Sequence, residues 1–192
     1  MKQSTNFLMG AILMSVSLHA SQPSFDKVFK LQGITFHVQA TNEGSLNQLT
    51  ITPSGLEVVN RVIKQEIDGS VTGAEVADIN ADGSPEIYVY VNSAGSGSYG
   101  SLVAYSANNK KSLSGIYLTP LEDDKKNSVG YMGHDEFTVI ENSLARRFPV
   151  YSEDDANCCP KGGTRQLEYK LFAGEASWQL KLLNSTTYKS KK

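Results

Sequence analysis

Several stretches of the sequence alternate between apolar and polar residues with a period of two. Their apolar positions are Ile34, Phe36 and Val38; Leu49 and Ile51; Leu167, Tyr169 and Leu171; and Trp178, Leu180 and Leu182. Successive side chains of a β-strand point to opposite faces of a sheet, so this period predicts half-buried antiparallel strands.

Turn-forming residues separate these stretches. They are Asn42-Glu43-Gly44, Asp68-Gly69, Asp82-Gly83, Asn108-Asn109, Gly162-Gly163 and Ala173-Gly174. Short strands separated by such turns favour a sandwich or a barrel. Only residues 119–127 have the features of a helix start, with Thr119 as the cap and Pro120 in the first position. We therefore predict an all-β fold, a single-domain antiparallel β-sandwich or flattened barrel with at most one short helix.

Residues 1–20 differ in character from the rest of the chain. Lys2 precedes an uncharged apolar run at residues 7–18, and Ala20 supplies the small residue of a cleavage site. This pattern predicts a secretory signal peptide cleaved after Ala20, and the apolar run is too short to span a bilayer. We expect residues 21–192 to form one exported β domain that is not bound to a membrane.

The charge balance of the chain is mildly acidic. There are 18 Lys and Arg residues against 20 Asp and Glu residues, which gives a net charge of −2 at pH 7. Proteins that bind nucleic acid concentrate positive charge, so we expect no nucleic-acid partner. The balance is compatible with a basic protein partner.

The segment Ile87–Val91 is apolar on both of its faces. Ile87, Val89 and Val91 suit a core, which leaves Tyr88 and Tyr90 on the opposite face. Two interpretations follow. The strand is buried on both sides, or the two tyrosines form a subunit interface in a homodimer, because tyrosine is enriched in interfaces.

Cys158 and Cys159 are the only cysteines and are adjacent in the sequence. Two thiols in an exported protein are expected to pair, although neighbouring residues reach the usual Cα separation of a disulfide only with strain. We favour a vicinal disulfide that clamps the turn at residues 157–163. A disulfide between two chains, reduced thiols and a metal site are the alternatives.

Residues 78–86 resemble the start of a calcium-binding loop. Asp78, Asn80 and Asp82 occupy positions 1, 3 and 5, Gly83 position 6 and Glu86 position 9. The position that holds the bidentate glutamate of an EF-hand is Val89, so that ligand is missing. A tight turn capped by Asp and Asn side chains is the favoured interpretation. An exported calcium- or saccharide-binding β module is the alternative.

Residues 93–101 form a loop of very small residues with one aromatic, Tyr99. The segment Gly95–Gly100 matches the spacing of a dinucleotide-binding motif, but a strand and not a helix follows it, so that motif is rejected. Ser96 and Ser98 also lack the spacing of a nucleophile elbow. A secreted serine hydrolase that uses one of these serines with His134 remains a less favoured alternative.

This loop carries the strongest indication of function. The segment 78–105, with Ser96-Gly97-Ser98-Tyr99 inside it, resembles the bacterial periplasmic inhibitors of invertebrate-type lysozyme, which carry a short Ser-Gly-x-Tyr loop. Residues that also look like that family are Gly130–Asp135, Arg146-Arg147-Phe148-Pro149 and Gly162–Tyr169.

The resemblance implies an exported, periplasmic protein that inhibits lysozyme and is not an enzyme. Lysozyme is the implied partner, and no cofactor or catalytic residue is expected. Ser96, Gly97, Ser98 and Tyr99 would enter the active-site cleft of the lysozyme. We expect Tyr131 and His134 to form a second contact loop.

Overall fold

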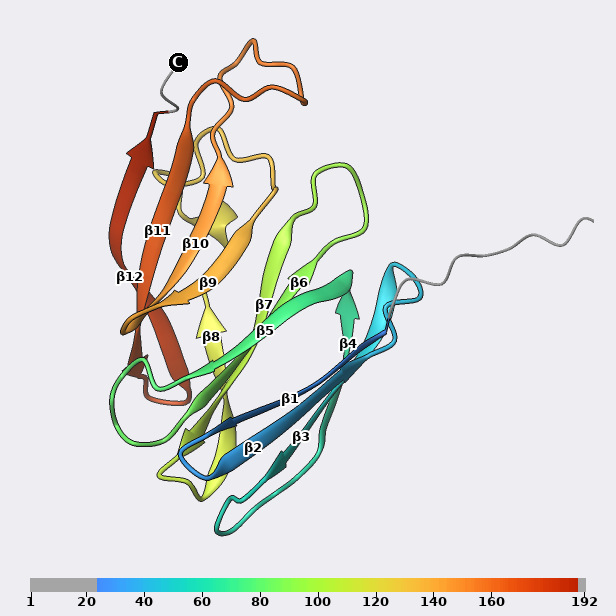
Figure 1. The fold of residues 1–192 in the computed structure, drawn as a ribbon. Coiled ribbons are helices and arrows are strands. Elements are labelled where there is room, and N and C mark those ends of the chain that lie inside the picture. The colour runs from blue at the N-terminus through green and yellow to red at the C-terminus, as the bar shows by residue number, and fades with distance from the viewer. Residues whose placement is uncertain (1–23, 190–192) are drawn as a thin grey trace, which may run out of the picture.

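The computed structural model describes residues 24–189. The signal peptide predicted for residues 1–20 therefore lies outside the described residues. The described chain consists of twelve β-strands and one short 3₁₀ helix, which are arranged in two sheets (Figure 1). The prediction of an all-β fold is confirmed. Among the described residues, no helix has the length and apolar character needed to cross a membrane.

The first sheet is a four-stranded antiparallel meander in the order β1-β2-β3-β4. Its strands are β1 (Phe25–Leu31), β2 (Ile34–Ala40), β3 (Leu46–Ser54) and β4 (Ile63–Asp68). Along β2 every second residue is buried, as the period of two in the sequence predicts.

The second sheet has eight strands in the order β5-β6-β7-β8-β12-β11-β10-β9. Its strands are β5 (Ser70–Ala77), β6 (Glu86–Asn92), β7 (Gly100–Asn108), β8 (Ser112–Leu118), β9 (Glu136–Ile140), β10 (Ser143–Pro149), β11 (Thr164–Ala173) and β12 (Trp178–Tyr188). β8 and β12 run parallel over three residue pairs, which differs from the predicted purely antiparallel pairing. This sheet curls so far that its edge strands β5 and β9 meet (Figure 1).

A side chain joins the two edges of the curled sheet. Glu75 on β5 accepts hydrogen bonds from the Thr138 hydroxyl (3.2 Å) and from the backbone N–H of Val139 (3.1 Å), both on β9. The carboxylate thus satisfies edge groups that would otherwise lack a strand partner. The result is a flattened barrel with the four-stranded sheet packed beside it.

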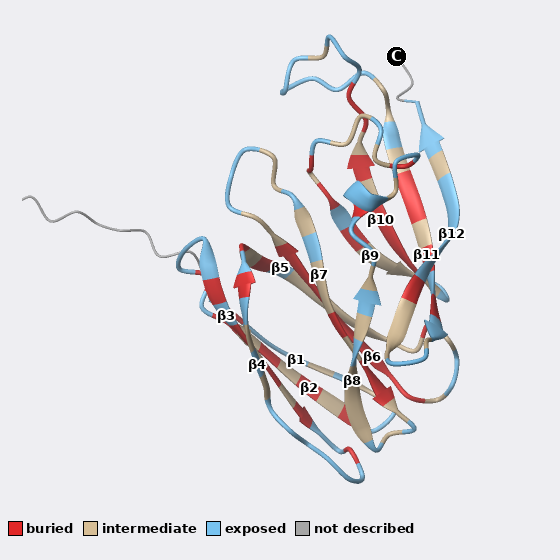
Figure 2. Ribbon diagram, turned by 180° about the vertical axis from the view of Figure 1, so that it is seen from behind, coloured by how far each residue is buried: buried red, intermediate tan, exposed pale blue. Residues whose placement is uncertain are grey.

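β6 separates two hydrophobic cores and is buried on both faces (Figure 2). Ile87, Val89 and Val91 pack against the four-stranded sheet, while Tyr88 and Tyr90 point into the barrel. Tyr88 is fully buried and Tyr90 is 7% exposed. The subunit-interface interpretation of these two tyrosines is therefore wrong, because their rings fill the core of the same chain.

The helix expected at residues 119–127 is reduced to a single 3₁₀ turn, η1 (Leu121–Asp123). Thr119 does not cap it, and Pro120 takes the cap position without a side-chain hydrogen bond. Asp124 ends the helix because its carboxylate accepts the backbone N–H groups of Lys126 and Asn127. A side chain that bonds nearby backbone in this way competes with the continuation of a helix.

Candidate functional site

The loop between β6 and β7, residues 93–99, extends beyond the ends of these two strands (Figure 1). Its neck is closed by two hydrogen bonds between Ser93 and Tyr99. The Ser93 N–H donates to the Tyr99 carbonyl (2.9 Å), and the Tyr99 N–H donates to the Ser93 hydroxyl (3.0 Å). At the tip the Ser98 N–H donates to the Gly95 carbonyl (3.2 Å). We call this segment the β6–β7 loop.

The side chains at the tip of the β6–β7 loop differ in exposure. Ser96 is exposed, and its hydroxyl makes no hydrogen bond within residues 24–189. Tyr99 is 46% exposed. A Cβ at Gly97 would meet the Tyr99 ring, so glycine is needed for the ring to lie along the loop. Ser98 is half-buried and adopts a positive φ of 42°. Ser96 and Tyr99 are thus the side chains that the loop exposes to solvent.

A second loop, residues 128–135, supports the first. The His134 N–H donates to the Gly97 carbonyl at 2.7 Å. Gly133 has φ +86°, and any Cβ there would collide with the Gly97 carbonyl oxygen. Only glycine combines that conformation with such a close approach. The tip of the β6–β7 loop is therefore fixed by backbone contact with its neighbour.

Asp135 holds the base of the β6–β7 loop from inside the protein. Its Oδ2 accepts hydrogen bonds from the Gly100 N–H (2.7 Å) and the Tyr131 hydroxyl (2.6 Å). Its Oδ1 accepts one from Nε of Arg146 (2.6 Å). Burial acts to lower the pKa of the Arg146 guanidinium, but the hydrogen bond and charge of Asp135 outweigh it and raise that pKa. Both side chains of this ion pair are almost wholly buried.

Aromatic rings continue this support outward. The Tyr99 ring meets the Tyr131 ring edge-on, with the centroids 5.6 Å apart, and Tyr131 meets Phe148 in the same way at 4.8 Å. Edge-to-face packing is a favoured geometry for aromatic pairs. Burial and the hydrogen bond to Asp135 raise the pKa of Tyr131 well above its ordinary value. Tyr131 therefore remains a neutral hydrogen-bond donor, and the Tyr99 ring packs against its ring.

The residues predicted for the site fall into two groups. Ser96, Gly97, Ser98 and Tyr99 lie together at the loop tip, and Tyr131 and His134 are brought against them. Tyr131 contributes a ring and His134 a backbone N–H. Sequence reasoning missed the support given by Asp135 and Arg146. The sequence did contain one indication of a buried ion pair, because Arg146 shares a strand face with the buried residues Leu144 and Phe148.

The geometry does not support a serine hydrolase among the described residues. The carboxylate of Asp135 accepts hydrogen bonds from Arg146, Tyr131 and Gly100. It makes no hydrogen bond to the His134 ring. The site contacts of His134 run through its backbone. A triad needs a base that is oriented by an acid and bonded to the nucleophile, and this arrangement lacks both bonds.

The loop at residues 78–86 lies at the opposite end of β6 from the β6–β7 loop. Asp78 accepts the backbone N–H groups of Asp82 (3.0 Å) and Gly83 (2.9 Å), and Asp82 accepts that of Ser84 (2.8 Å). Carboxylate oxygens of Asp78, Asp82 and Glu86 lie within 4.8 Å of one another. The hydrogen bonds support the interpretation as a capped turn.

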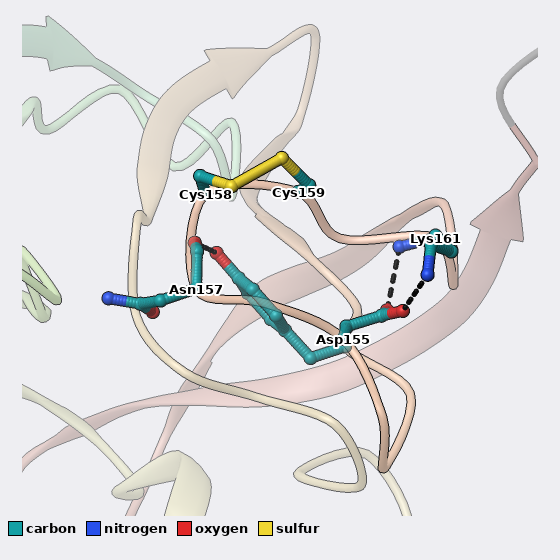
Figure 3. Close-up of a disulfide and its surroundings, with 6 residues drawn as sticks. Asp155, Asn157, Cys158, Cys159 and Lys161 are labelled. Atoms are coloured by element: carbon teal, nitrogen blue, oxygen red, sulfur yellow. Dashed lines mark hydrogen bonds and ion pairs between the residues drawn. A yellow bond between two sulfur atoms is a disulfide. The ribbon is translucent and has the colours of Figure 1, made fainter.

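Cys158 and Cys159 form a disulfide with each other, with their Cα atoms 3.8 Å apart (Figure 3). The loop that contains them joins β10 to β11 and is held by other contacts as well. The Tyr151 hydroxyl donates to the Asn157 carbonyl (3.0 Å). Asp155 accepts the backbone N–H of Lys161 (2.8 Å), and the Lys161 ammonium lies 3.3 Å from the same carboxylate (Figure 3).

This disulfide loop lies beside the second loop of the site. The Tyr151 N–H donates to the Gly130 carbonyl at 2.8 Å, and Tyr131 forms an isolated β-bridge with Val150. The loop at residues 128–135 therefore contacts the β6–β7 loop on one side and the disulfide loop on the other (Figure 1).

Comparisons with known proteins bear on the segment that contains the β6–β7 loop. Residues 58–127 match the family model described as the periplasmic lysozyme inhibitor of I-type lysozyme. Neither the comparison with curated proteins nor that with solved structures gives a match. Asp135 and Arg146 lie outside the matched residues.

The matched family is one of inhibitors and not of enzymes, and its description points to lysozyme as the partner and the periplasm as the compartment. The match covers β4 to η1 and with them the whole β6–β7 loop. It thus confirms the resemblance on which the Ser-Gly-x-Tyr loop was assigned. Residues 58–127 are thus similar to the family of periplasmic lysozyme inhibitors of I-type lysozyme.

Proposed function

We propose that this protein inhibits an invertebrate-type lysozyme by inserting the β6–β7 loop into the active-site cleft of the enzyme. The observation that carries the proposal is the contrast between the exposed side chains of the loop and its fastened backbone. The tip exposes Ser96 and Tyr99. The backbone is held at the base by the bond from Gly100 to Asp135 and at the tip by the bond from His134 to Gly97.

The chemistry of the tip suits a glycosidase cleft. Such a cleft holds a pair of carboxyl groups on either side of the scissile bond. The Ser96 hydroxyl has no partner within the described residues and is free to donate to a carboxylate. Hydrogen bonds to charged groups are roughly twice as strong as neutral ones. The exposed Tyr99 ring offers a flat surface where sugars normally bind.

The fastened backbone of the loop lowers the entropic cost of binding. An immobilised side chain costs about 0.5–1.5 kcal/mol when it is ordered only on association, and loop ordering adds to this. Here Tyr99 already rests on Tyr131, and Gly97 is already bonded to His134. The loop therefore pays most of its ordering cost during folding, before it meets the enzyme.

Export completes the proposal. Residues 1–20 act as a signal peptide that is cleaved after Ala20, which delivers the inhibitor to the periplasm, where it protects peptidoglycan. Sequencing the N-terminus of the protein from a periplasmic extract tests this step. A mature chain that begins at Ser21 is the expected result, and an intact N-terminus would contradict it.

The test of the function is an inhibition assay against invertebrate-, chicken- and goose-type lysozymes acting on peptidoglycan. The wild-type protein should inhibit the invertebrate type most strongly. Ser96→Ala combined with Tyr99→Ala should raise the inhibition constant at least about 100-fold, because truncating a central interface residue costs about 2 kcal/mol or more.

A matched control truncates an aromatic residue and a serine in the β11–β12 hairpin, at the end of β11 that is away from the disulfide loop. Phe172, which is also 46% exposed, and Ser177 lie in the β11–β12 hairpin region. The variant with Phe172→Ala and Ser177→Ala should inhibit like the wild type. The proposal is overturned if the wild type inhibits none of the three lysozymes, or if the Ser96 and Tyr99 variant inhibits as well as the wild type.

A further inference from the structure

A cavity of about 370 Å³ opens at the root of the β6–β7 loop. The loop and the start of β7 form one wall, and the segment from the end of β8 to η1 forms the other. The residues that line it include Asp68, Tyr99, Leu102, Pro120, Glu122 and Arg146. This volume lies in the range of ligand-binding pockets, roughly 300–1,000 Å³.

The floor and the mouth of the cavity differ in character. Leu121, Phe137 and Arg146 are buried and form its floor. Asp68 and Glu122 are exposed and lie toward solvent. Neither carboxylate has a hydrogen-bond or ion-pair partner within the described part of the chain. The positive charge of Arg146 is balanced by Asp135 at 2.6 Å. The cavity therefore combines a mixed apolar and polar lining with uncompensated negative charge at its mouth.

The position of the cavity decides what can reach it. When the β6–β7 loop enters a cleft, the rim of that cleft comes against the root of the loop. Ser93 and Gly100 mark this root, and both line the cavity. A stable protein–protein interface also needs about 800 Å² per partner, or roughly 20–30 residues a side, which is more than a loop of this length provides. Further contact surface around the loop is therefore required.

We propose that this cavity receives a lysine or arginine side chain from the rim of the lysozyme cleft. The aliphatic stem of such a side chain would lie along Leu102 and Pro120, and its charged end would face Asp68 and Glu122. The Tyr99 ring at the cavity wall offers a face for a cation–π contact. The two proteins would then interlock, because a loop of the inhibitor enters the lysozyme and a side chain of the lysozyme enters the inhibitor. This inference rests on the proposed inhibition of lysozyme.

The test removes both charges from the mouth of the cavity. Asp68→Asn with Glu122→Gln should weaken binding to an invertebrate-type lysozyme about tenfold, because a close charge pair between proteins couples by about 1.5 kcal/mol or more. The loss should shrink at high ionic strength. The control, Glu66→Gln with Glu175→Gln, removes the same charge from exposed sites outside the cavity and should stay within about twofold of the wild type. Thermal unfolding of each variant shows whether the fold is kept.

The partner residue is found by a double-mutant cycle. Each lysine and arginine that flanks the lysozyme cleft is replaced by alanine and measured against the wild type and the Asp68 and Glu122 variant. One lysozyme variant should bind the wild-type inhibitor about tenfold more weakly than wild-type lysozyme does. The same variant should bind the Asp68→Asn, Glu122→Gln inhibitor almost as tightly as wild-type lysozyme does.

The two proposals fail separately. If the wild type inhibits and the Ser96 and Tyr99 variant does not, the proposed function stands. In that case, unchanged binding of the Asp68 and Glu122 variant, or a cycle in which no cationic residue couples, overturns only the cavity proposal. A wild-type protein that does not bind lysozyme overturns both.

Discussion

Asp135 and Arg146 form a buried ion pair, and the same carboxylate holds the backbone of the β6–β7 loop. Nε of Arg146 lies 2.6 Å from Oδ1, while Oδ2 accepts the Gly100 N–H at 2.7 Å. A Cβ at Gly100 would collide with the Asp135 side chain, so the backbone approaches the carboxylate as closely as it can. The presentation of Ser96 and Tyr99 is therefore coupled to a charge pair inside the barrel.

Arg146→Met should destabilise the protein by about 3–5 kcal/mol, because it leaves the Asp135 carboxylate buried without its counter-charge. Asp135→Asn combined with Arg146→Met should cost less than Arg146→Met alone, since no charge is then left unpaired. Urea unfolding of the wild type and the variants measures these differences. Equal losses for the single and the double variant would show that the pair acts by packing and not by charge.

Gly133→Ala should weaken lysozyme inhibition about tenfold, because the new Cβ pushes against the Gly97 carbonyl and displaces the loop tip. Gly83→Ala is the matched control. Its φ of +81° is close to the +86° of Gly133, but a Cβ there meets nothing within 4 Å. Both variants should lose about 1–2 kcal/mol of stability from the left-handed conformation. Only Gly133→Ala should impair inhibition, and equal inhibition by the two variants would contradict the support assigned to Gly133.

Replacing both Cys158 and Cys159 by Ser should change the free energy of unfolding by less than about 0.5 kcal/mol. A disulfide stabilises mainly by closing a loop in the unfolded chain, and adjacent residues enclose almost none. Tyr151 and Asp155 hold the surrounding loop without the disulfide. Thermal unfolding with and without a reductant measures the effect. A loss above about 2 kcal/mol would show that the disulfide, and not these hydrogen bonds, orders the loop.

Local patterns in the sequence were enough to predict the strands and the projecting loop. The alternation at Ile34, Phe36 and Val38 directly reflects the burial of every second residue on β2. The parallel pairing of β8 with β12 was not predictable in this way. It joins Ile116 to Trp178 across a long stretch of chain, and no local period records such a contact.

The candidate site also has one part that the sequence predicts and one part that it does not. The exposed tip at Ser96 and Tyr99 is contiguous in the sequence and could be predicted from its small residues together with the resemblance to the Ser-Gly-x-Tyr loop of the inhibitor family. Its support depends on the register of β9 against β10, which pairs Phe137 with Arg146 and so brings Asp135 to the guanidinium. That register is set by tertiary packing, and only the isolated charge of Arg146 on an apolar strand face hinted at it.

Glu86 makes the stability of the fold depend on pH. It is fully buried at the start of β6, where it accepts hydrogen bonds from the Ile79 N–H (3.0 Å) and the Ser106 hydroxyl (3.3 Å). Burial, with added repulsion from Asp78 and Asp82, raises the pKa of Glu86 to about 8. Near pH 7 the folded protein therefore keeps a proton on Glu86.

Stability should fall as the pH rises from about 4.5 to about 8. In this window the unfolded chain has lost the Glu86 proton while the folded chain retains it, so the folded state binds more protons. The free energy of unfolding should fall by at most about 1.4 kcal/mol per pH unit. Urea unfolding at a series of pH values, with EDTA present, measures the slope. Glu86→Gln cannot lose a proton and should gain stability relative to the wild type as the pH rises.

Glu66→Gln is the control for this series, because Glu66 is exposed on β4 and should leave the slope unchanged. Parallel curves for the wild type and Glu86→Gln would show that Glu86 does not titrate in this range. Repeating the series with calcium in place of EDTA tests the remaining alternative for Asp78, Asp82 and Glu86. A cation bound there would stabilise the wild type at pH 8 more than Glu86→Gln, because binding needs the ionised carboxylate.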